Sequence, residues 1–342
     1  LRQELEALPQ HPRDKGDLRN LFPRAKRVFD LMAHVRYGMA RRLARINPYP
    51  RPWRHMAIPA EDGVQVAAWL GPQHWDAPSD WGLVIVPGMF GTKDDTSTKR
   101  RAIHIHRHWR IPVLAIDLRA FGESTGIATA GWKEALDIAA AAKFLVAETG
   151  VKRVAVLAES MGGAAALNAL AQDSSSHSDL LSGGVLCFSA FMDAKDAVSY
   201  ISHPPPRNHP FRPTWAGFRR LLLAKSDGAY DRFDDLLADV ARVYNLKGVE
   251  ELYDLANPKW KVPMMRQPTL LVHSTDDPIV PVRHAHRMER YAEGMDHVQV
   301  LLTAWGSHTM FELLDPHWFW EVMRRFYGAV NNVELENLAR HR

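Results

Sequence analysis

The sequence has few of the features that mark secreted or membrane proteins. It has one cysteine, Cys187, so no disulfide can form within the chain. It has no Asn-x-Ser/Thr glycosylation site and no apolar stretch in its first 20 residues that resembles a secretory signal. No uninterrupted apolar run approaches the roughly 18 residues that a membrane span needs. These absences exclude a disulfide scaffold and predict a cytoplasmic protein.

Motifs for nucleotides and metals are also missing. The sequence contains neither a Gly-x-Gly-x-x-Gly fingerprint nor a Walker A loop. His104, His106 and His108 alternate, and the first and last would share one face of a helix. However, no acidic residue or cysteine lies close by in the sequence to complete a metal shell, and arginines surround the three histidines. We therefore expect no cofactor and no metal.

Positive charge is concentrated near the beginning of the chain. Of 342 residues, 46% are hydrophobic and 24% charged, which is typical of a globular protein with a sizeable core. Residues 1–55 hold 13 Lys/Arg and 5 Asp/Glu, whereas the remainder holds 30 and 34. The chain lacks a nucleic-acid reader motif and aromatic residues interleaved with its basic ones, so we expect no nucleic-acid partner.

Most of the basic excess lies in residues 24–46. Apolar residues recur there every three or four positions, which predicts an amphipathic helix with arginines on its remaining faces. Such a helix packs its apolar stripe on its own domain or on a second copy in a homo-oligomer, and we favour this interpretation. Contact with an anionic membrane surface is the alternative.

From about residue 54 onward, short β-branched runs alternate with helical patterns, which predicts an α/β protein with a mostly parallel sheet. Several runs are apolar on both faces, as strands covered on two sides are. The predicted strands are Val64–Leu70, Leu83–Pro87, Val113–Asp117, Val154–Ala158, Gly184–Ser189, Leu270–His273 and Val298–Leu302. The clearest predicted helices are Trp132–Glu148, Met161–Ala171, Pro281–Ala292 and Phe311–Tyr327.

Between Ala190 and Pro268 the sequence shows helix-like segments, such as Phe218–Lys225 and Phe233–Asn245, but no clear strand. We interpret this interval as a helical cap over the carboxyl edge of the sheet, where ligands bind in open α/β folds. A separate domain unrelated to the site is the alternative. The predicted division is an N-terminal basic amphipathic segment, a core in two parts, a helical cap and a C-terminal tail, at residues 1–53, 54–189 with 266–330, 190–265 and 331–342.

Two serines compete for the role of nucleophile. Gly122–Gly126 matches Gly-x-Ser-x-Gly literally, whereas the stretch around Ser160 has alanine in the first glycine position. The motif works as a sharp turn from a strand directly into a helix, with small residues two before and two after the serine. Ser160 meets this condition because it follows a predicted strand and opens a small-residue helix. Ser124 comes seven residues after a strand, so we interpret it as a loop serine.

Five stretches in the right order resemble the α/β-hydrolase family. They are residues 84–91, similar to the strand end before the oxyanion loop; 117–124, similar to the Asp-x-Arg-Gly-x-Gly-x-Ser loop; the turn at Ser160; 276–281; and 306–308. The resemblance covers roughly residues 54–328 and implies a mostly parallel sheet flanked by helices, with a helical cap inserted between strands. Pro87 stands where histidine is common, and Ala120 and Ala158 stand where glycine is common. These departures concern the substrate subclass more than the chemistry.

A serine hydroxyl needs an imidazole to take its proton, and the imidazole needs a carboxylate to orient it. In this fold the chain order is serine, acid, histidine. His308 fits because it follows the last predicted strand and a flexible Gly-Ser pair. The acid comes from Asp276 or Asp277. The family places it three residues before valine and four before proline, which favours Asp277 and leaves Asp276 as a turn or capping residue.

The backbone N–H groups of Met89 and Met161 are the predicted donors to the oxyanion. The sequence thus predicts a serine hydrolase that cleaves a carboxylic ester or related bond of a small acyl substrate. Two rival hypotheses stay open, namely an acyltransferase on the same scaffold and a non-catalytic binding protein.

Overall fold

The computed structural model describes residues 1–8, 49–175, 179–208, 212–226 and 228–341. Eight strands form one sheet in the order β1-β2-β4-β3-β5-β6-β7-β8. The pairs β1–β2 and β2–β4 are antiparallel, and the remaining neighbours are parallel. The strands are β1 (Arg54–Pro59), β2 (Gln65–Gly71), β3 (Trp81–Val86), β4 (Val113–Ile116), β5 (Arg153–Glu159), β6 (Val185–Phe188), β7 (Thr269–Ser274) and β8 (Val298–Thr303).

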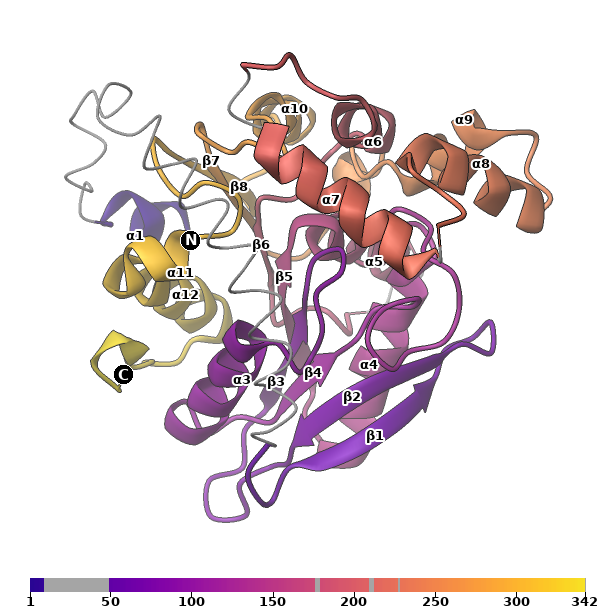
Figure 1. Ribbon diagram of the computed structural model, residues 1–342. Helices are drawn as coiled ribbons and strands as arrows, with labels where there is room; N and C mark the ends of the chain where they lie inside the picture. Colours follow the sequence, from indigo (N-terminus) through magenta and orange to yellow (C-terminus); the bar gives the residue numbers. More distant parts are fainter. Residues whose placement is uncertain (9–48, 176–178, 209–211, 227, 342) are drawn as a thin grey trace.

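Helices cover both faces of this sheet, as Figure 1 shows. Along β3, Leu83 and Ile85 pack into the core cluster that contains α3 and α12, whereas Val84 and Val86 pack into the cluster that contains α4, α5 and α10. Because successive side chains of a strand point to opposite faces, each buried strand contributes to both clusters. The bounds are α3 (Thr96–His108), α4 (Glu134–Thr149), α5 (Ser160–Ser175), α10 (Arg283–Tyr291) and α12 (Pro316–Asn331). The mostly parallel sheet flanked by helices confirms the predicted fold class.

All seven predicted strands are present, but β1 was not predicted. Its side chains are mostly exposed, and only Ile58 is fully buried. An edge strand with one buried side chain lacks the two-sided apolar pattern that identified the others.

The predicted helix Phe311–Tyr327 is wrong as a single element. The chain forms α11 (Phe311–Leu314), leaves the helix at Asp315 and begins α12 at Pro316. Proline disfavours helical backbone in the residue before it and suits the first helical position, where its missing N–H costs nothing. Asp315 is extended there (φ −148°) and its carboxylate accepts a hydrogen bond from the N–H of Trp318.

Between β6 and β7 the chain forms α6 (Ala194–Ser202), α7 (Arg212–Lys225), α8 (Phe233–Val243), α9 (Val249–Ala256) and the 3₁₀ turn η2 (Val262–Met264). Helix α6 contacts α7, α8 and α9, and Figure 1 shows these four helices grouped along the top of the molecule. Helix α6 begins at a capping residue, because the carboxylate of Asp193 accepts a hydrogen bond from the N–H of Asp196.

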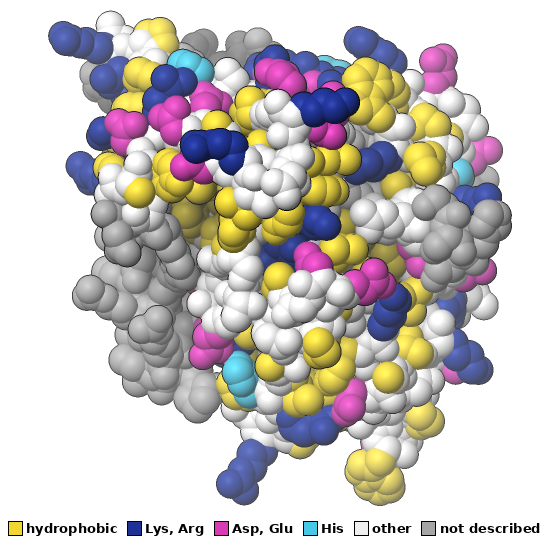
Figure 2. Space-filling model, turned by 90° about the vertical axis from the view of Figure 1, so that its right-hand side faces the viewer, with side chains coloured by type: hydrophobic (Ala, Val, Ile, Leu, Met, Phe, Trp, Pro, Cys, Tyr) yellow, Lys and Arg dark blue, Asp and Glu magenta, His cyan; other side chains and the backbone are white. Residues whose placement is uncertain are grey.

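The N-terminal helix α1 (Arg2–Glu6) contacts α12, and the short η3 (Leu338–His341) also packs on α12. The basic segment predicted to be helical, residues 24–46, lies outside the described residues. Among the described residues, no helix has both the length and the apolar character needed to cross a membrane. On the face shown in Figure 2, basic and acidic side chains are interspersed rather than separated by sign.

Candidate active site

Ser160 lies at the point where β5 ends and α5 begins. Its backbone is in the left-handed region (φ +52°), which a residue with a Cβ adopts only at a cost of about 1–3 kcal/mol. The turn is crowded, because a Cβ on Gly162 would come within 2.3 Å of the carbonyl oxygen of Pro87. The sequence prediction of a sharp turn with a small residue two positions after the serine agrees with this packing.

A continuous chain of hydrogen bonds joins three side chains from three different loops. The Oγ of Ser160 lies 2.9 Å from Nε2 of His308. On the other side of the ring, Nδ1 of His308 lies 2.9 Å from Oδ2 and 3.1 Å from Oδ1 of Asp277. With its proton on Nδ1, the imidazole donates to the carboxylate and its Nε2 accepts the serine hydroxyl. This arrangement can take a proton from the serine as it attacks.

The loop that carries His308 lies between β8 and α11 and is sharply bent. Ser307 (φ +48°) and Thr309 (φ +58°), on either side of the imidazole, are both left-handed. Gly306 (φ +135°) has no space for a side chain, since a Cβ there would lie 2.2 Å from the ring of Phe311. The packing of Phe311 against this glycine thereby fixes where the loop turns.

The two adjacent aspartates, Asp276 and Asp277, have different partners. Asp277 contacts the imidazole, whereas Oδ1 of Asp276 accepts a hydrogen bond of 2.7 Å from the N–H of Ser307. The family resemblance favoured Asp277 over Asp276 as the acid, and in the structure it is Asp277 that contacts His308. Asp276 instead fixes the backbone of Ser307, the residue just before His308.

The carboxylate of Asp277 is buried and well supplied with donors. Its Oδ1 accepts hydrogen bonds from the N–H groups of Ile279 (2.8 Å) and Val280 (2.9 Å). Burial raises the pKa of Asp277, but the interactions with His308, the nearby His273 and the backbone outweigh it, so the pKa is lower than usual. Asp277 is therefore ionised at neutral pH, as an orienting carboxylate must be.

His273, on β7, is buried beside the acid, with Nε2 at 4.0 Å from Oδ2 of Asp277. Its Nε2 contacts the carbonyl oxygen of Val280 at 2.9 Å, and we assign the proton to this nitrogen. Burial lowers the pKa of His273, which favours the neutral ring. This hydrogen bond to Val280 joins β7 to the loop that carries Asp277.

The loop after β3 passes directly beside the serine. A Cβ on Gly88 would lie 3.0 Å from Cβ of Ser160, so glycine permits this close approach. Phe90 is left-handed (φ +64°), and the N–H of Gly91 donates to the carbonyl of Gly88 at 2.9 Å. The two residues predicted to supply oxyanion donors, Met89 on this loop and Met161 after the serine, line the same cavity as Ser160.

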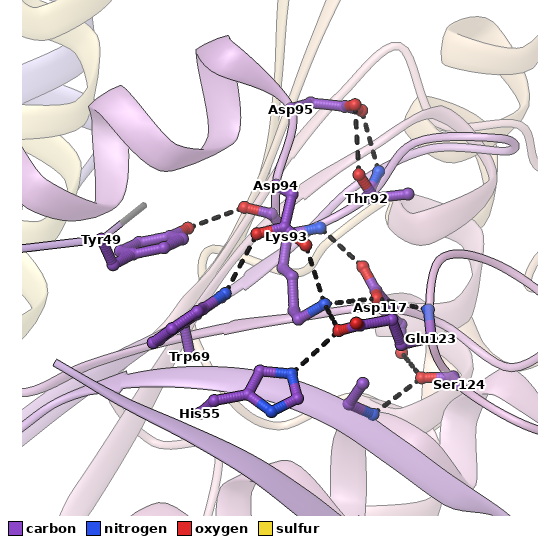
Figure 3. A network of polar contacts seen from close by, with 11 residues as sticks. Tyr49, His55, Trp69, Thr92, Lys93, Asp94, Asp95, Asp117, Glu123 and Ser124 are labelled. Carbon is purple, nitrogen blue, oxygen red and sulfur yellow. Dashed lines mark hydrogen bonds and ion pairs between the residues drawn. The ribbon is translucent and has the colours of Figure 1, made fainter. Parts of the chain in front are cut away.

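A buried lysine anchors the far end of this loop (Figure 3). The ammonium of Lys93 contacts carboxylate oxygens of Asp94 (2.9 Å), Asp117 (3.0 Å) and Glu123 (2.5 Å). The backbone N–H of Lys93 also donates to Asp117 at 2.6 Å. Burial lowers the pKa of Lys93, but the carboxylates outweigh it and keep the pKa above its usual value. Lys93 thus supplies the positive charge among three acidic groups that lie within 4.8 Å of one another.

Ser124, in the literal motif, belongs to the same network (Figure 3). Its hydroxyl donates to the carbonyl oxygen of Asp117 and accepts from the N–H of Ala67, both at 2.8 Å. These bonds join the loop after β4 to β2, and Ser124 does not line the cavity that contains Ser160.

A cavity of about 230 Å³ opens at Ser160 and His308. Most of its lining is apolar, and three of the apolar side chains come from α6, one turn apart or adjacent on the helix. Polar residues, including Thr98 and Glu159, also line the cavity. The apolar lining residues are Met89, Phe90, Ala130, Met161, Phe191, Ala197, Val198, Ile201, Ile279, Val280 and Met310.

Sequence reasoning did not identify the contribution of α6 or that of Glu159 as part of this wall. The apolar spacing of Ala197, Val198 and Ile201 is the signal that indicates a buried helix face there. Nothing in the spacing shows that this face meets Ser160, more than 30 residues away in the chain.

The comparisons with known proteins agree with this architecture. A model of the alpha/beta hydrolase family matches residues 102–322. The chain belongs to the α/β-hydrolase family. This establishes the family that its motifs resembled.

Several solved structures share the fold at low sequence identity. An esterase of Pyrococcus furiosus is 18% identical, with a TM-score of 0.59 over 81% of this chain and 91% of that one. A 2,6-dihydroxy-pseudo-oxynicotine hydrolase is 14% identical, with a TM-score of 0.59 over 88% and 74%. A puromycin-hydrolysing peptidase of Mycobacterium tuberculosis is 17% identical, with a TM-score of 0.56 over 82% and 40%. No curated protein matches the sequence.

Proposed function

We propose that this α/β-hydrolase is a serine hydrolase that cleaves a carboxylic ester or related acyl bond through an acyl-enzyme. The hydrogen-bonded chain from Ser160 through His308 to Asp277, open to a cavity, carries the proposal. A serine on a strained turn, an imidazole hydrogen-bonded to its hydroxyl and an ionised carboxylate are the parts that this chemistry requires.

In the first half of the reaction, Oγ of Ser160 attacks the acyl carbonyl carbon while Nε2 of His308 takes the hydroxyl proton. Asp277 stabilises the imidazolium that results. The carbonyl oxygen becomes an oxyanion, to which the backbone N–H groups of Met89 and Met161 donate. The intermediate then collapses, the bond to the alcohol breaks, and the alcohol leaves with the proton from His308.

In the second half, water attacks the acyl carbon, and His308 takes its proton and returns it to Ser160. The acid is released and the enzyme is regenerated. An alcohol or amine in place of water would transfer the acyl group, so the same groups serve an acyltransferase. Transfer of the acyl group to water is the proposed step, because the solved structures that share this fold include an esterase and a hydrolase.

The insertion between β6 and β7 is proposed as a cap that shapes the substrate pocket. Its helix α6 contributes Ala197, Val198 and Ile201 to the apolar wall. A compact cavity with this lining favours a substrate whose buried part is apolar and small.

The test is a panel of p-nitrophenyl esters of increasing acyl length, assayed with the wild-type protein and with Ser160→Ala. We expect turnover in the wild type and none above background in the variant, whereas Ser124→Ala retains most of it. A fluorophosphonate probe should label the wild type and not Ser160→Ala. Folded wild-type protein that neither turns over any ester nor takes the probe would refute the proposal, and adding alcohol or amine acceptors separates hydrolysis from transfer.

A further inference from the structure

Arg101 is a buried cation between the two loops that supply the proposed nucleophile and base. It lies on α3 and its side chain is 5% exposed. Its Nη1 donates to Oε1 of Glu159 and its Nε donates to Oε2 of Glu312, both at 2.7 Å. The guanidinium also lies over the ring of Phe319, 4.8 Å from its centroid.

The two carboxylates lie close in sequence to the proposed nucleophile and base. Glu159 immediately precedes Ser160 and lines the cavity, and Glu312 follows His308 by four residues at the start of the next helix. One planar guanidinium therefore joins the end of β5 to α11, the helix that follows the loop carrying His308. A lysine has a single ammonium and cannot present the same rigid fork to both carboxylates.

The ion pair also sets the charge beside the reacting atoms. Glu312 has a second cationic partner, since Nη2 of Arg100 lies 2.7 Å from its Oε1. Glu159 has Arg101 as its cationic partner among the described residues. Without Arg101, a half-buried carboxylate would stand unpaired next to the serine, where negative charge opposes an oxyanion.

We infer that Arg101 is a positioning residue. It fixes the turn that carries Ser160 relative to the loop that carries His308, and it neutralises the negative charge of Glu159 beside the proposed oxyanion. This inference rests on the proposed function, because it concerns the reactivity of Ser160.

The experiment measures the second-order rate constant for labelling of Ser160 by a fluorophosphonate. In this step an Oγ–P bond forms, the P–F bond breaks, fluoride leaves and His308 takes the hydroxyl proton. It reports on the serine and its base without a known substrate. We expect Arg101→Met, which keeps the apolar volume over Phe319, to slow labelling roughly 10²-fold.

A second substitution distinguishes two roles of Arg101, namely neutralising the charge of Glu159 and supporting the fold. In the double variant Arg101→Met/Glu159→Gln the unpaired carboxylate is gone, and we expect Ser160 to be labelled about tenfold faster than in Arg101→Met alone. A purely structural role of Arg101 predicts no such recovery. Arg100→Met is the matched control, because it removes a cation from Glu312 but not from Glu159, and we expect its labelling rate to stay close to that of the wild type.

Each outcome bears on the inference. Arg101→Met that is folded by circular dichroism and labels at the wild-type rate would overturn it, as would a double variant no faster than the single one. If Arg101→Met does not fold, the uncharged but hydrogen-bonding Arg101→Gln takes its place, with a similar loss and the same recovery expected, and a wild-type rate again counts against the inference. Wild-type protein that does not label at all would instead refute the proposed function.

Discussion

The carboxylates of Asp276 and Asp277 bind the same loop at different atoms. Asp277 contacts the ring of His308 at Nδ1, and Asp276 accepts a hydrogen bond from the backbone N–H of Ser307. Asp277 thus orients the imidazole of His308, and Asp276 fixes the backbone of the preceding residue. Their substitutions should therefore have unequal effects.

The first prediction concerns these two residues. Asp277→Asn places an amide against Nδ1, favours the wrong tautomer of His308 and should lower kcat roughly 10³–10⁴-fold. Asp276→Asn keeps an oxygen that accepts from Ser307, so its loss should be at least about two orders of magnitude smaller. Steady-state kinetics on an ester substrate compare the two. Equal losses in folded proteins would contradict the assignment of Asp277 as the acid.

The second prediction tests the crowding at the nucleophile turn. Gly162→Ala introduces a Cβ 2.3 Å from the carbonyl oxygen of Pro87, a backbone atom that must move with its loop. We expect a loss of stability of about 2 kcal/mol, together with a clear fall in kcat, because the loop after β3 that is proposed to bind the oxyanion is displaced. Thermal unfolding and kinetics measure both. Gly248→Ala is the control, since a Cβ there meets nothing within 4 Å, and a Gly162→Ala protein indistinguishable from it would disprove the argument.

The third prediction concerns the apolar wall from α6. Ile201 is 6% exposed and lines the cavity. Ile201→Ala removes three carbons from this wall, so the preferred acyl chain should lengthen by about one to three carbons. Relative kcat/KM across the ester panel gives the preference. Val243→Ala, on an exposed part of α8, should leave the preference unchanged. If both variants keep the wild-type profile, α6 does not bound the acyl pocket.

The fourth prediction concerns stability at acid pH. His284, on α10, is buried, and its Nδ1 accepts a hydrogen bond of 3.2 Å from the N–H of Met192. Burial, with a smaller contribution from Arg283 and Arg287, lowers its pKa from 6.5 to about 3, despite the opposing effect of Asp196. Between these two values the unfolded chain binds a proton that the folded protein does not. The free energy of unfolding should therefore fall as the pH decreases through this window.

The slope from one such histidine approaches roughly 1.4 kcal/mol per pH unit. His284→Gln removes the titrating group while keeping an acceptor for Met192, so its stability should decrease less steeply from about pH 6.5 to pH 4. Denaturant unfolding at several pH values measures the difference. Parallel curves for variant and wild type would show that His284 is not protonated on unfolding.

Much of the fold follows from local patterns in the sequence. Strands such as β5 are apolar on both faces, and helix patterns lie between several of them, so a parallel sheet was predicted without knowledge of long-range contacts. The split at Pro316 was missed because the periodicity of apolar residues continues across it, although proline supplied the signal. The edge strand β1 was not predicted because its mostly exposed side chains lack the apolar pattern of a strand that is buried on both faces.

The sequence by itself determined which serine stands on a sharp turn, because a strand, a serine and small residues in direct succession are a local property. It also narrowed the acid to two adjacent carboxylates, of which the family resemblance favoured Asp277. The tertiary structure brings Asp277 to His308, and it alone decided that α6 lines the cavity and that Arg101 joins Glu159 to Glu312. These depend on the relative placement of segments up to 211 residues apart, and such placement comes from packing the whole sheet and its helices together.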